Sequence, residues 1–216
     1  MTPSAVLFDC DGVIVDSERP MMRLLHEDMV GFGLDVDFEE MVALNLGGAV
    51  PQFAPRLREM GADVPEDWVE GFYARLYAIL EEGTPLVDGV DAAVRAVDEA
   101  GLAIAIGSNG RQSKMKITLG QHPDLRDRFE GRIFSGQDMG MMKPAPDLYL
   151  HMADALDVAP SACVVVEDSP TGARAAKRAG MRCLGYDGHG DGALLADEGA
   201  EVFGDMRSLP GLLGLN

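Results

Sequence analysis

Short apolar runs alternate with helix-patterned segments over most of the chain. Each run ends in a polar or glycine-containing stretch, which is typical of buried strands that lead into loops. Strands are predicted at residues 4–8, 102–107, 131–135, 162–166 and 181–186, with a weaker candidate at 201–203. Helices are predicted between them at residues 90–100, 111–120, 146–156 and 171–179. Gly101, Gly120 and Gly180 stand where helix C-terminal caps prefer glycine. Strand alternating with helix predicts an α/β fold whose parallel sheet is covered on both faces.

One region, residues 17–83, breaks this alternation. It contains helical patterns at residues 18–31, 38–46, 51–60 and 66–82, without a strand candidate. Because helices alone cannot continue a βαβ winding, this region is predicted to be a separate helical domain inserted after the first strand. The predicted core therefore comprises residues 1–16 and 84–216, and Gly83, Pro85 and Gly89 mark the return to it.

The chain carries a large excess of acidic residues. Among its 216 residues, Asp and Glu number 36 and Lys and Arg number 18, which gives a formal net charge of −18. Such a surface repels nucleic-acid phosphates and anionic membranes, so neither is an expected partner. An anionic substrate would need a local site where a cation and a few basic side chains reverse this field. The sequence leaves the oligomeric state open between a monomer and a small homo-oligomer.

The sequence also predicts a cytoplasmic protein. Its apolar runs are far shorter than the roughly 20 residues that cross a bilayer, and its N-terminus lacks the basic region of a signal peptide. The three cysteines, Cys10, Cys163 and Cys183, have no CxxC spacing and are predicted to be buried, reduced thiols. A reducing compartment follows from that prediction.

Polar residues that suit phosphoryl transfer follow four of the predicted strands. They are Asp9 and Asp11 after the first strand, Ser108 and Asn109 after the second, Lys143 in the loop after the third, and Glu167 and Asp168 after the fourth. The carboxyl ends of parallel strands lie at one edge of a sheet, which is where open α/β sheets bind ligands. These side chains are therefore predicted to form a single site.

The residue types indicate a role for each side chain. Asp9 and Asp11 face the same side if the first strand stays extended as far as Asp11. Asp9 is expected to be the nucleophile that forms an aspartyl phosphate, and Asp11 to protonate the leaving alcohol and then activate water. Ser108 and Asn109 are expected to bind phosphate oxygens at the start of the following helix, and Lys143 to supply positive charge.

The clustered carboxylates predict a Mg²⁺ site. Two neighbouring carboxylates repel each other unless a cation or a shared proton lies between them. Oxygen ligands from Asp9 and Asp168, and from Glu167 directly or through water, suit Mg²⁺. The metal would screen the anionic phosphate from the carboxylate that attacks it.

Four segments together resemble the four ordered motifs of the haloacid dehalogenase superfamily. They read DCDGVIVDSE from residue 9, SNG at 108–110, KPAPDLY at 143–149 and VVVEDSPTG at 164–172. The resemblance spans the chain and implies a Rossmann-like core, a mobile helical cap at 17–83, bound Mg²⁺, and the roles given above for Asp9 and Asp11. It further implies that the main-chain carbonyl of Asp11 is a metal ligand. The most similar members are the sugar-phosphate, phosphogluconate and phosphoglycolate phosphatases and the β-phosphoglucomutases.

Departures from these patterns rank the alternatives. Dehalogenases of the superfamily lack the second aspartate, so Asp11 argues against that activity. The mutases carry a histidine shortly after the first motif and an arginine in a cap loop. Here residues 18–22 lack the histidine and residues 46–51 lack the arginine, although Arg56 or Arg58 could substitute. A phosphatase acting on a small phosphorylated metabolite, a sugar phosphate or a phosphogluconate-like compound, is therefore favoured, with a mutase as the alternative.

A non-enzymatic phosphate acceptor is the third hypothesis. Signalling receiver domains also gather acids, a hydroxyl and a lysine at the strand ends of a parallel sheet. The helical insert argues against such a domain, and so does the placement of both Asp9 and Asp11 after one strand. Residues that select the leaving group are expected in the insert, where the sequence does not single them out.

Overall fold

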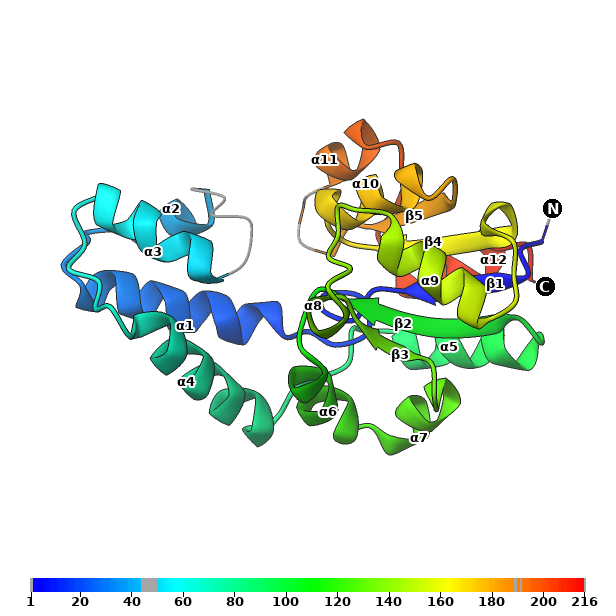
Figure 1. Ribbon diagram of the computed structural model, residues 1–216, viewed down its shortest axis with the longest axis horizontal. Helices are drawn as coiled ribbons and strands as arrows, with labels where there is room; N and C mark the ends of the chain where they lie inside the picture. The colour runs from blue at the N-terminus through cyan, green and yellow to red at the C-terminus, as the bar shows by residue number, and fades with distance from the viewer. Residues whose placement is uncertain (1, 44–49, 189, 191, 216) are drawn as a thin grey trace. The chain divides into compact units, whose positions relative to one another are not determined.

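Two compact units make up the described chain, which comprises residues 2–43, 50–188, 190 and 192–215 of the computed structural model (Figure 1). The first unit comprises Met1–Asp16 and Thr84–Asn216, and the second comprises Ser17–Gly83. The chain thus leaves the first unit soon after its first strand and returns to it once the second unit is complete.

Six parallel strands form the sheet of the first unit, in the order β3-β2-β1-β4-β5-β6. They are β1 (Ala5–Phe8), β2 (Ala103–Ser108), β3 (Ile133–Ser135), β4 (Cys163–Glu167), β5 (Arg182–Tyr186) and β6 (Glu201–Phe203). All six coincide with predicted runs, and β2 and β4 extend one residue further, to Ser108 and Glu167. The predicted α/β class with a Rossmann-like sheet is confirmed. Strands β2 and β4 flank β1, so the strand order reverses there, at the position where such sheets bind ligands.

Each face of the sheet has its own buried core because successive strand residues point to opposite faces. Val6 and Phe8 of β1 belong to one core, and Ala5 and Leu7 belong to the other. The first core includes residues of α5 (Val90–Glu99), α6 (Gln112–Gly120), α7 (Pro123–Arg126) and α12 (Leu209–Leu212). The second includes residues of α9 (Asp147–Ala155), α10 (Pro170–Arg178) and α11 (Gly192–Asp197). Figure 1 shows α5, α6 and α7 on one side of the sheet and α10 and α11 on the other.

Several short elements lie outside the predicted segments. They are α7, α8 (Gly136–Met139), α11, α12 and the 3₁₀ turns at Asp127–Phe129, Pro160–Ala162 and Met206–Ser208. Elements this short show no helical period in the sequence. Gly101 and Gly180 adopt left-handed φ angles of 77° and 71° after α5 and α10, as their predicted capping positions require. Gly120 is instead the last residue of α6.

Two further sequence-based expectations concern the cysteines and membrane insertion. Cys10, Cys163 and Cys183 are free and buried, as predicted. None of the helices in the described part of the chain is both long enough and apolar enough to cross a bilayer.

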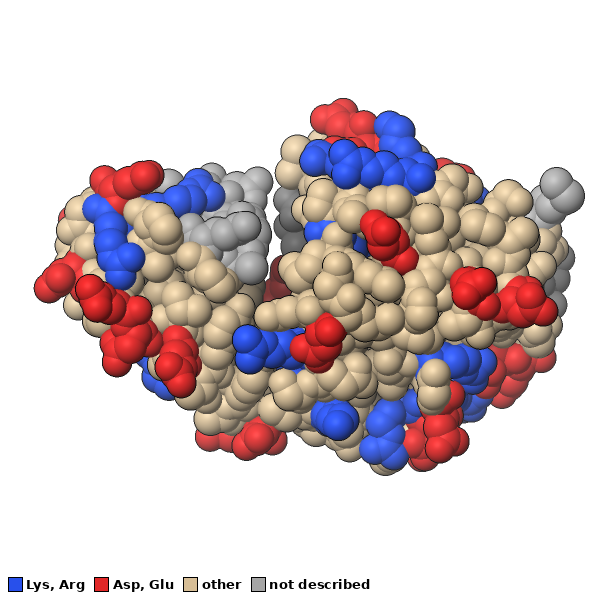
Figure 2. Space-filling model, viewed as in Figure 1, with Lys and Arg blue, Asp and Glu red and all other residues tan. Residues whose placement is uncertain are grey.

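On the face drawn in Figure 2, acidic and basic side chains are interspersed, in keeping with the spread of acidic residues along the sequence.

The second unit is entirely helical within its described residues. It contains α1 (Glu18–Gly31), α2 (Phe38–Ala43), α3 (Val50–Glu59) and α4 (Trp68–Glu82). The predicted helix at 38–46 is present as far as Ala43, and residues 44–49, which include most of the loop considered for the mutase, lie outside the described residues. The buried residues of α4 form one stripe with a spacing of four: Trp68, Phe72, Leu76 and Leu80.

A buried carboxylate links α1 to α4. Asp28 of α1 is only 8% exposed, and it accepts hydrogen bonds from the indole N–H of Trp68 at 2.6 Å and from two guanidinium nitrogens of Arg75 at 2.7 and 2.6 Å. Charge-assisted hydrogen bonds of this kind are short and strong. Asp28 therefore stabilises the helical unit through contacts between distant parts of its sequence.

Replacing Asp28 with Ala is expected to destabilise this unit by about 2 kcal/mol, because the buried indole N–H of Trp68 loses its acceptor. Urea unfolding followed by the fluorescence of Trp68, the only tryptophan, measures this change. Asp91→Ala is the matched control, since it also removes one acid, here from an exposed pair with Arg95 on α5, and should change stability by less than about 0.5 kcal/mol. Equal effects of the two substitutions would contradict the proposed link.

Candidate active site

The seven predicted site residues lie at or just beyond the carboxyl ends of β1, β2 and β4 and in the loop before α9. Asp9 directly follows β1, Ser108 ends β2, and Glu167 ends β4. Of the seven, Asp9, Ser108, Lys143 and Glu167 are buried. Adjacent strand ends therefore bring together side chains that are up to 159 positions apart in the chain (9 to 168).

The backbone turns sharply between the two aspartates. The extended conformation ends at Phe8, the chain bends at Cys10, and Gly12 adopts a left-handed φ of 79°. The condition that β1 stays extended as far as Asp11 is therefore not met. A Cβ atom at Gly12 would lie 1.7 Å from Oδ2 of Asp168, so glycine is required both for the turn and for the close approach of that carboxylate.

Lys143 lies between two buried carboxylates. Its ammonium pairs with Oδ1 of Asp9 and, at 2.6 Å, with Oε1 of Glu167, and its side chain is only 3% exposed. Burial opposes the charge, but the neighbouring Asp9 and Glu167 outweigh this effect and raise the pKa of Lys143 above its ordinary value. Burial also raises the pKa of Asp9 to about 7, against the attraction of Lys143. Lys143 therefore supplies a permanent positive charge at this edge of the sheet.

The side chain of Asn109 holds the main chain of Lys143. Its Nδ2 donates to the carbonyl oxygen of Lys143 at 3.1 Å, and its Oδ1 accepts from the N–H of Lys143 at 2.8 Å. Both ends of the Asn109 amide thus contribute to fixing the lysine loop, and its binding of phosphate stays a prediction. The prediction did not foresee this contact because the two residues lie 34 positions apart.

Asp11 is held by two donors from the neighbouring strand and helix. Ser108 Oγ donates to its Oδ2 at 3.2 Å, and Lys114 Nζ pairs with its Oδ1 at 2.7 Å. The Ser108 hydroxyl in turn accepts the main-chain N–H of Gly110 at 2.8 Å. Although burial opposes the charge of Lys114, Asp11 raises its pKa, so the lysine remains protonated. Lys114 was not predicted from the sequence; its only signal was its place in the first turn of the helix that follows Ser108.

Three carboxylates lie close enough to share a cation. One oxygen from each of Asp9, Glu167 and Asp168 lies within 4.8 Å of the others. Three carboxylate oxygens form a hard donor set of the kind that Mg²⁺ prefers. The predicted contribution of Asp11 is its main-chain carbonyl rather than its side chain, so it does not enter this group of carboxylates. The arrangement can therefore place a divalent cation next to Asp9 and the Lys143 ammonium.

Two further residues at the site were missed. Tyr149 donates its hydroxyl to Oε1 of Glu167 at 2.6 Å, and Ser169 donates both its N–H and its hydroxyl to Oε2, at 3.2 and 3.0 Å. Tyr149 lies within the segment 143–149 and Ser169 within the segment 164–172, both of which resemble family motifs. Neither the spacing nor the residue type predicts from the sequence that Glu167 is their hydrogen-bond partner.

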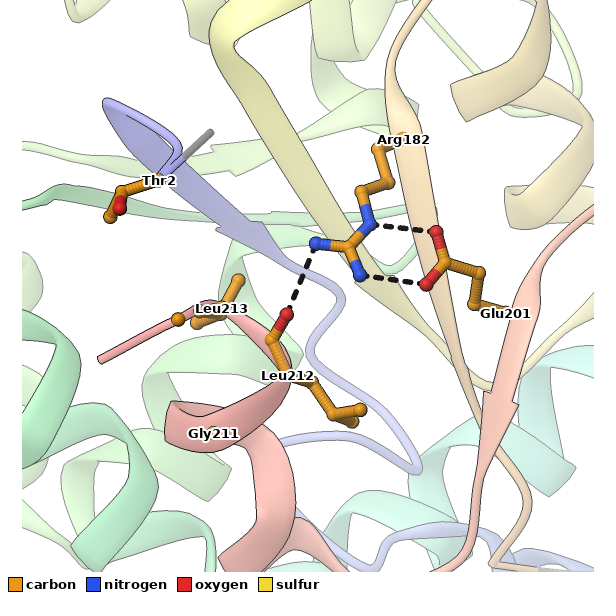
Figure 3. Close-up of a pocket in the computed structure, with 7 residues that line it drawn as sticks. Thr2, Arg182, Glu201, Gly211, Leu212 and Leu213 are labelled. Carbon is orange, nitrogen blue, oxygen red and sulfur yellow. Dashed lines mark hydrogen bonds and ion pairs between the residues drawn. The ribbon is translucent and has the colours of Figure 1, made fainter. Parts of the chain in front are cut away.

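A separate surface hollow lies at the opposite ends of the strands (Figure 3). It has a volume of about 560 Å³ and is lined by Arg182 and Glu201, which begin β5 and β6, together with Thr2 and residues 211–214. Arg182 donates to both carboxylate oxygens of Glu201 at 2.7 Å and to the carbonyl of Leu212 at 3.2 Å. These bonds tie the sheet edge to α12 and account for the charged side chains that line the hollow.

Comparison with known proteins identifies the family. Residues 3–180 match the model of the haloacid dehalogenase-like hydrolases. The chain belongs to this family. The predicted superfamily and enzyme class are thereby confirmed for this haloacid dehalogenase-like hydrolase.

The relatives of this hydrolase include named phosphatases. It is 32% identical over 184 residues to hexitol phosphatase B of Escherichia coli, covering 83% of this chain and 82% of that protein. It is 28% identical over 210 residues to 6-phosphogluconate phosphatase of the same species, covering 96% and 93%. Among solved structures, a haloacid dehalogenase family hydrolase of Deinococcus radiodurans with bound phosphate and sodium is 30% identical, with a TM-score of 0.83 and coverage of 99% and 96%.

Proposed function

We propose that this hydrolase is a Mg²⁺-dependent phosphatase of a small phosphorylated metabolite, a sugar phosphate or a phosphogluconate-like compound, and that it acts through an aspartyl phosphate on Asp9. The observation that carries the proposal is the pairing of Asp9 with the buried Lys143, beside two further carboxylates, at the point where the strand order reverses. The names of the two E. coli relatives support this substrate class.

Asp9 would attack the phosphorus atom of the substrate. A carboxylate oxygen forms the new bond to phosphorus, and the bond between phosphorus and the ester oxygen breaks. Lys143, held by Asn109 at its main chain and by Glu167 at its ammonium, would hydrogen-bond the phosphate oxygens and offset their charge. When substrate binds, the hydroxyl of Ser108 would turn its single proton from Asp11 to a further phosphate oxygen, at the start of the loop that leads into α6.

Asp11 would handle the protons. It would donate a proton to the departing alkoxide and then accept one from the water that attacks the aspartyl phosphate, which regenerates Asp9 and releases inorganic phosphate. Ser108 and Lys114 hold both of its carboxylate oxygens at the end of β2. These contacts keep Asp11 ordered when no substrate is present.

The residues present fit a Mg²⁺ ion. Asp9, Glu167 and Asp168 provide the carboxylate oxygens, and the main-chain carbonyl of Asp11 would complete the protein ligands that the resemblance implies. When bound, Mg²⁺ polarises the phosphate and neutralises charge that builds up on its oxygens. The three carboxylates carry more negative charge than Lys143 alone can balance, which is what a cation at this position would offset.

The helical unit would act as the cap of the enzyme. A cap excludes water while the aspartyl phosphate forms and selects the leaving group through its own side chains. The mutase alternative would need a cap arginine to hold a second phosphate. Arg58 does not meet this need as placed, because its guanidinium donates to the carbonyl oxygens of Val64 and Pro65 at 3.0–3.2 Å. Arg56 stays open as a substitute, and the phosphatase names of the two E. coli relatives favour hydrolysis.

The test is phosphate release from a panel of hexitol phosphates, sugar phosphates, phosphogluconate, phosphoglycolate and an aryl phosphate. We expect turnover with Mg²⁺ and a loss of at least about 10³-fold in EDTA, restored by added Mg²⁺. Activity that persists undiminished in EDTA would contradict the metal-dependent mechanism. Conversion of β-glucose 1-phosphate to glucose 6-phosphate with a bisphosphate primer, without release of phosphate, would establish the mutase instead.

A further inference from the structure

Tyr149 contacts Glu167 and Lys143 of the proposed catalytic site, but it takes part in no step of the proposed reaction. It lies on α9 and is fully buried. Its hydroxyl donates to Oε1 of Glu167 at 2.6 Å, and the centroid of its ring lies 4.9 Å from Nζ of Lys143. A cation at this distance from an aromatic ring is attracted by the ring quadrupole. One side chain thus touches both members of the Lys143–Glu167 ion pair.

Glu167 is fixed by four donors. Its Oε1 accepts from Lys143 and Tyr149, both at 2.6 Å, and its Oε2 accepts from the N–H and the hydroxyl of Ser169. Two acceptors on each oxygen account for the full capacity of a carboxylate. A Cβ atom at Gly172 of α10 would lie 1.7 Å from Oε1 of Glu167, so glycine is required for the helix to pack against this carboxylate. Glu167 is thus a rigid anion.

The position of the Lys143 ammonium depends on this anion. The main chain of Lys143 is fixed by Asn109, but its four-carbon side chain could place the ammonium in several positions. Glu167 and Asp9 hold the ammonium from two sides, and the ring of Tyr149 supports it from a third. Without the Tyr149 hydroxyl, one oxygen of Glu167 would lose a donor and the carboxylate could turn, carrying the ammonium with it.

We propose that Tyr149 is a positioning residue for Lys143: its hydroxyl fixes the Glu167 carboxylate and its ring supports the ammonium, so that the lysine stays aligned with Asp9 to receive the phosphate. The proposal rests on the proposed function, because it assigns Lys143 the phosphate oxygens as ligands.

Tyr149→Phe tests the proposal, because it keeps the ring and its packing and removes only the hydroxyl. The affinity for inorganic phosphate, measured by titration calorimetry with saturating Mg²⁺, should fall about tenfold, and kcat/KM should fall by at least as much. The thermal midpoint should change little. Tyr149→Leu, which also removes the ring, should lose more. Tyr186→Phe in β5, which packs on Phe203, is the matched control and should behave like the wild type.

The outcomes separate the proposal from the function on which it rests. A Tyr149→Phe protein with unchanged phosphate affinity and kcat/KM would overturn the positioning role while the wild type still released phosphate. A shifted Mg²⁺ midpoint with unchanged phosphate affinity would overturn it as well, because Glu167 would then act on the metal rather than through Lys143. A wild-type protein that neither bound nor released phosphate would remove the proposed function together with this inference.

Discussion

Replacing Asp9 with Asn is expected to abolish phosphate release, lowering kcat by about 10⁴-fold or more. The amide cannot form the bond to phosphorus that the proposed mechanism requires, while its shape and its neighbours stay nearly the same. The loss should appear with every substrate of the panel, including an aryl phosphate whose leaving group needs no proton. Asp124→Asn, at an exposed position on α7, removes the same charge outside the site and should keep full activity.

The stability of this variant distinguishes lost chemistry from lost folding. Burial raises the pKa of Asp9 from 3.8 to about 7 in the folded metal-free protein. A carboxyl group whose folded pKa is raised binds a proton more tightly in the folded state, so stability falls as the pH rises from about 4 to about 7. The amide side chain that replaces Asp9 in the variant does not titrate.

Urea unfolding in EDTA should therefore show a smaller loss of stability over this pH range for Asp9→Asn than for the wild type. An Asp9→Asn protein that is as stable as the wild type at pH 7 and still releases phosphate would contradict the nucleophile assignment.

The second large effect is expected for Lys143→Met, in both stability and activity. The substitution leaves Asp9 and Glu167 buried without the ammonium between them, and breaking a buried ion pair in this way costs about 3–5 kcal/mol. Removing the cation that faces the phosphate should also lower kcat/KM by about 10³-fold. Urea unfolding in EDTA and steady-state kinetics in Mg²⁺ measure the two effects separately.

Mg²⁺ should restore part of the stability of Lys143→Met but little of its activity. A divalent cation neutralises the same carboxylates, whereas it does not replace the hydrogen bonds from lysine to phosphate. Lys116→Met, at an exposed position of α6, is the matched control and should change stability by less than about 0.5 kcal/mol. A Lys143→Met protein as stable as this control would show that the buried ion pair is not formed.

The sheet could be predicted from the sequence because its three central strands, β1, β2 and β4, are built on continuous apolar runs between polar loops. Runs such as residues 162–166 have no polar position that a solvent-facing strand would need, so burial on both faces follows directly. Parallel pairing then places the residues that follow each strand at one edge. This is why Asp9 and Lys143, 134 positions apart, could be assigned to one site before any contact was known.

The contacts inside the site could not be predicted in the same way. The turn after Asp11 uses a left-handed Gly12 whose missing Cβ leaves room for Asp168, a residue more than 150 positions later. The engagement of Asn109 with the main chain of Lys143 depends on where two loops meet. The position of a residue after a parallel strand fixes the edge of the sheet at which it lies. The direction in which its side chain points there is set by tertiary packing.

Lys114 and Tyr149 show the same limit for helices. Lys114 lies on a helix beside a recognised segment and Tyr149 on a helix within one. Helical spacing alone does not show toward which neighbour such a side chain points. Their partners, Asp11 and Glu167, come from other strands. Only the packing of α6 and α9 on the sheet selects these pairs.

The most direct test of the central claim is the detection of a phosphoryl group on Asp9. The enzyme would be mixed with excess substrate and Mg²⁺, quenched in acid within one turnover, digested, and analysed by mass spectrometry, with Asp9→Asn as the blank. The account predicts a peptide containing Asp9 that carries one added phosphoryl group and loses it in hydroxylamine. Burst release of the alcohol product with unmodified Asp9, or with the phosphoryl group on another residue, would contradict it.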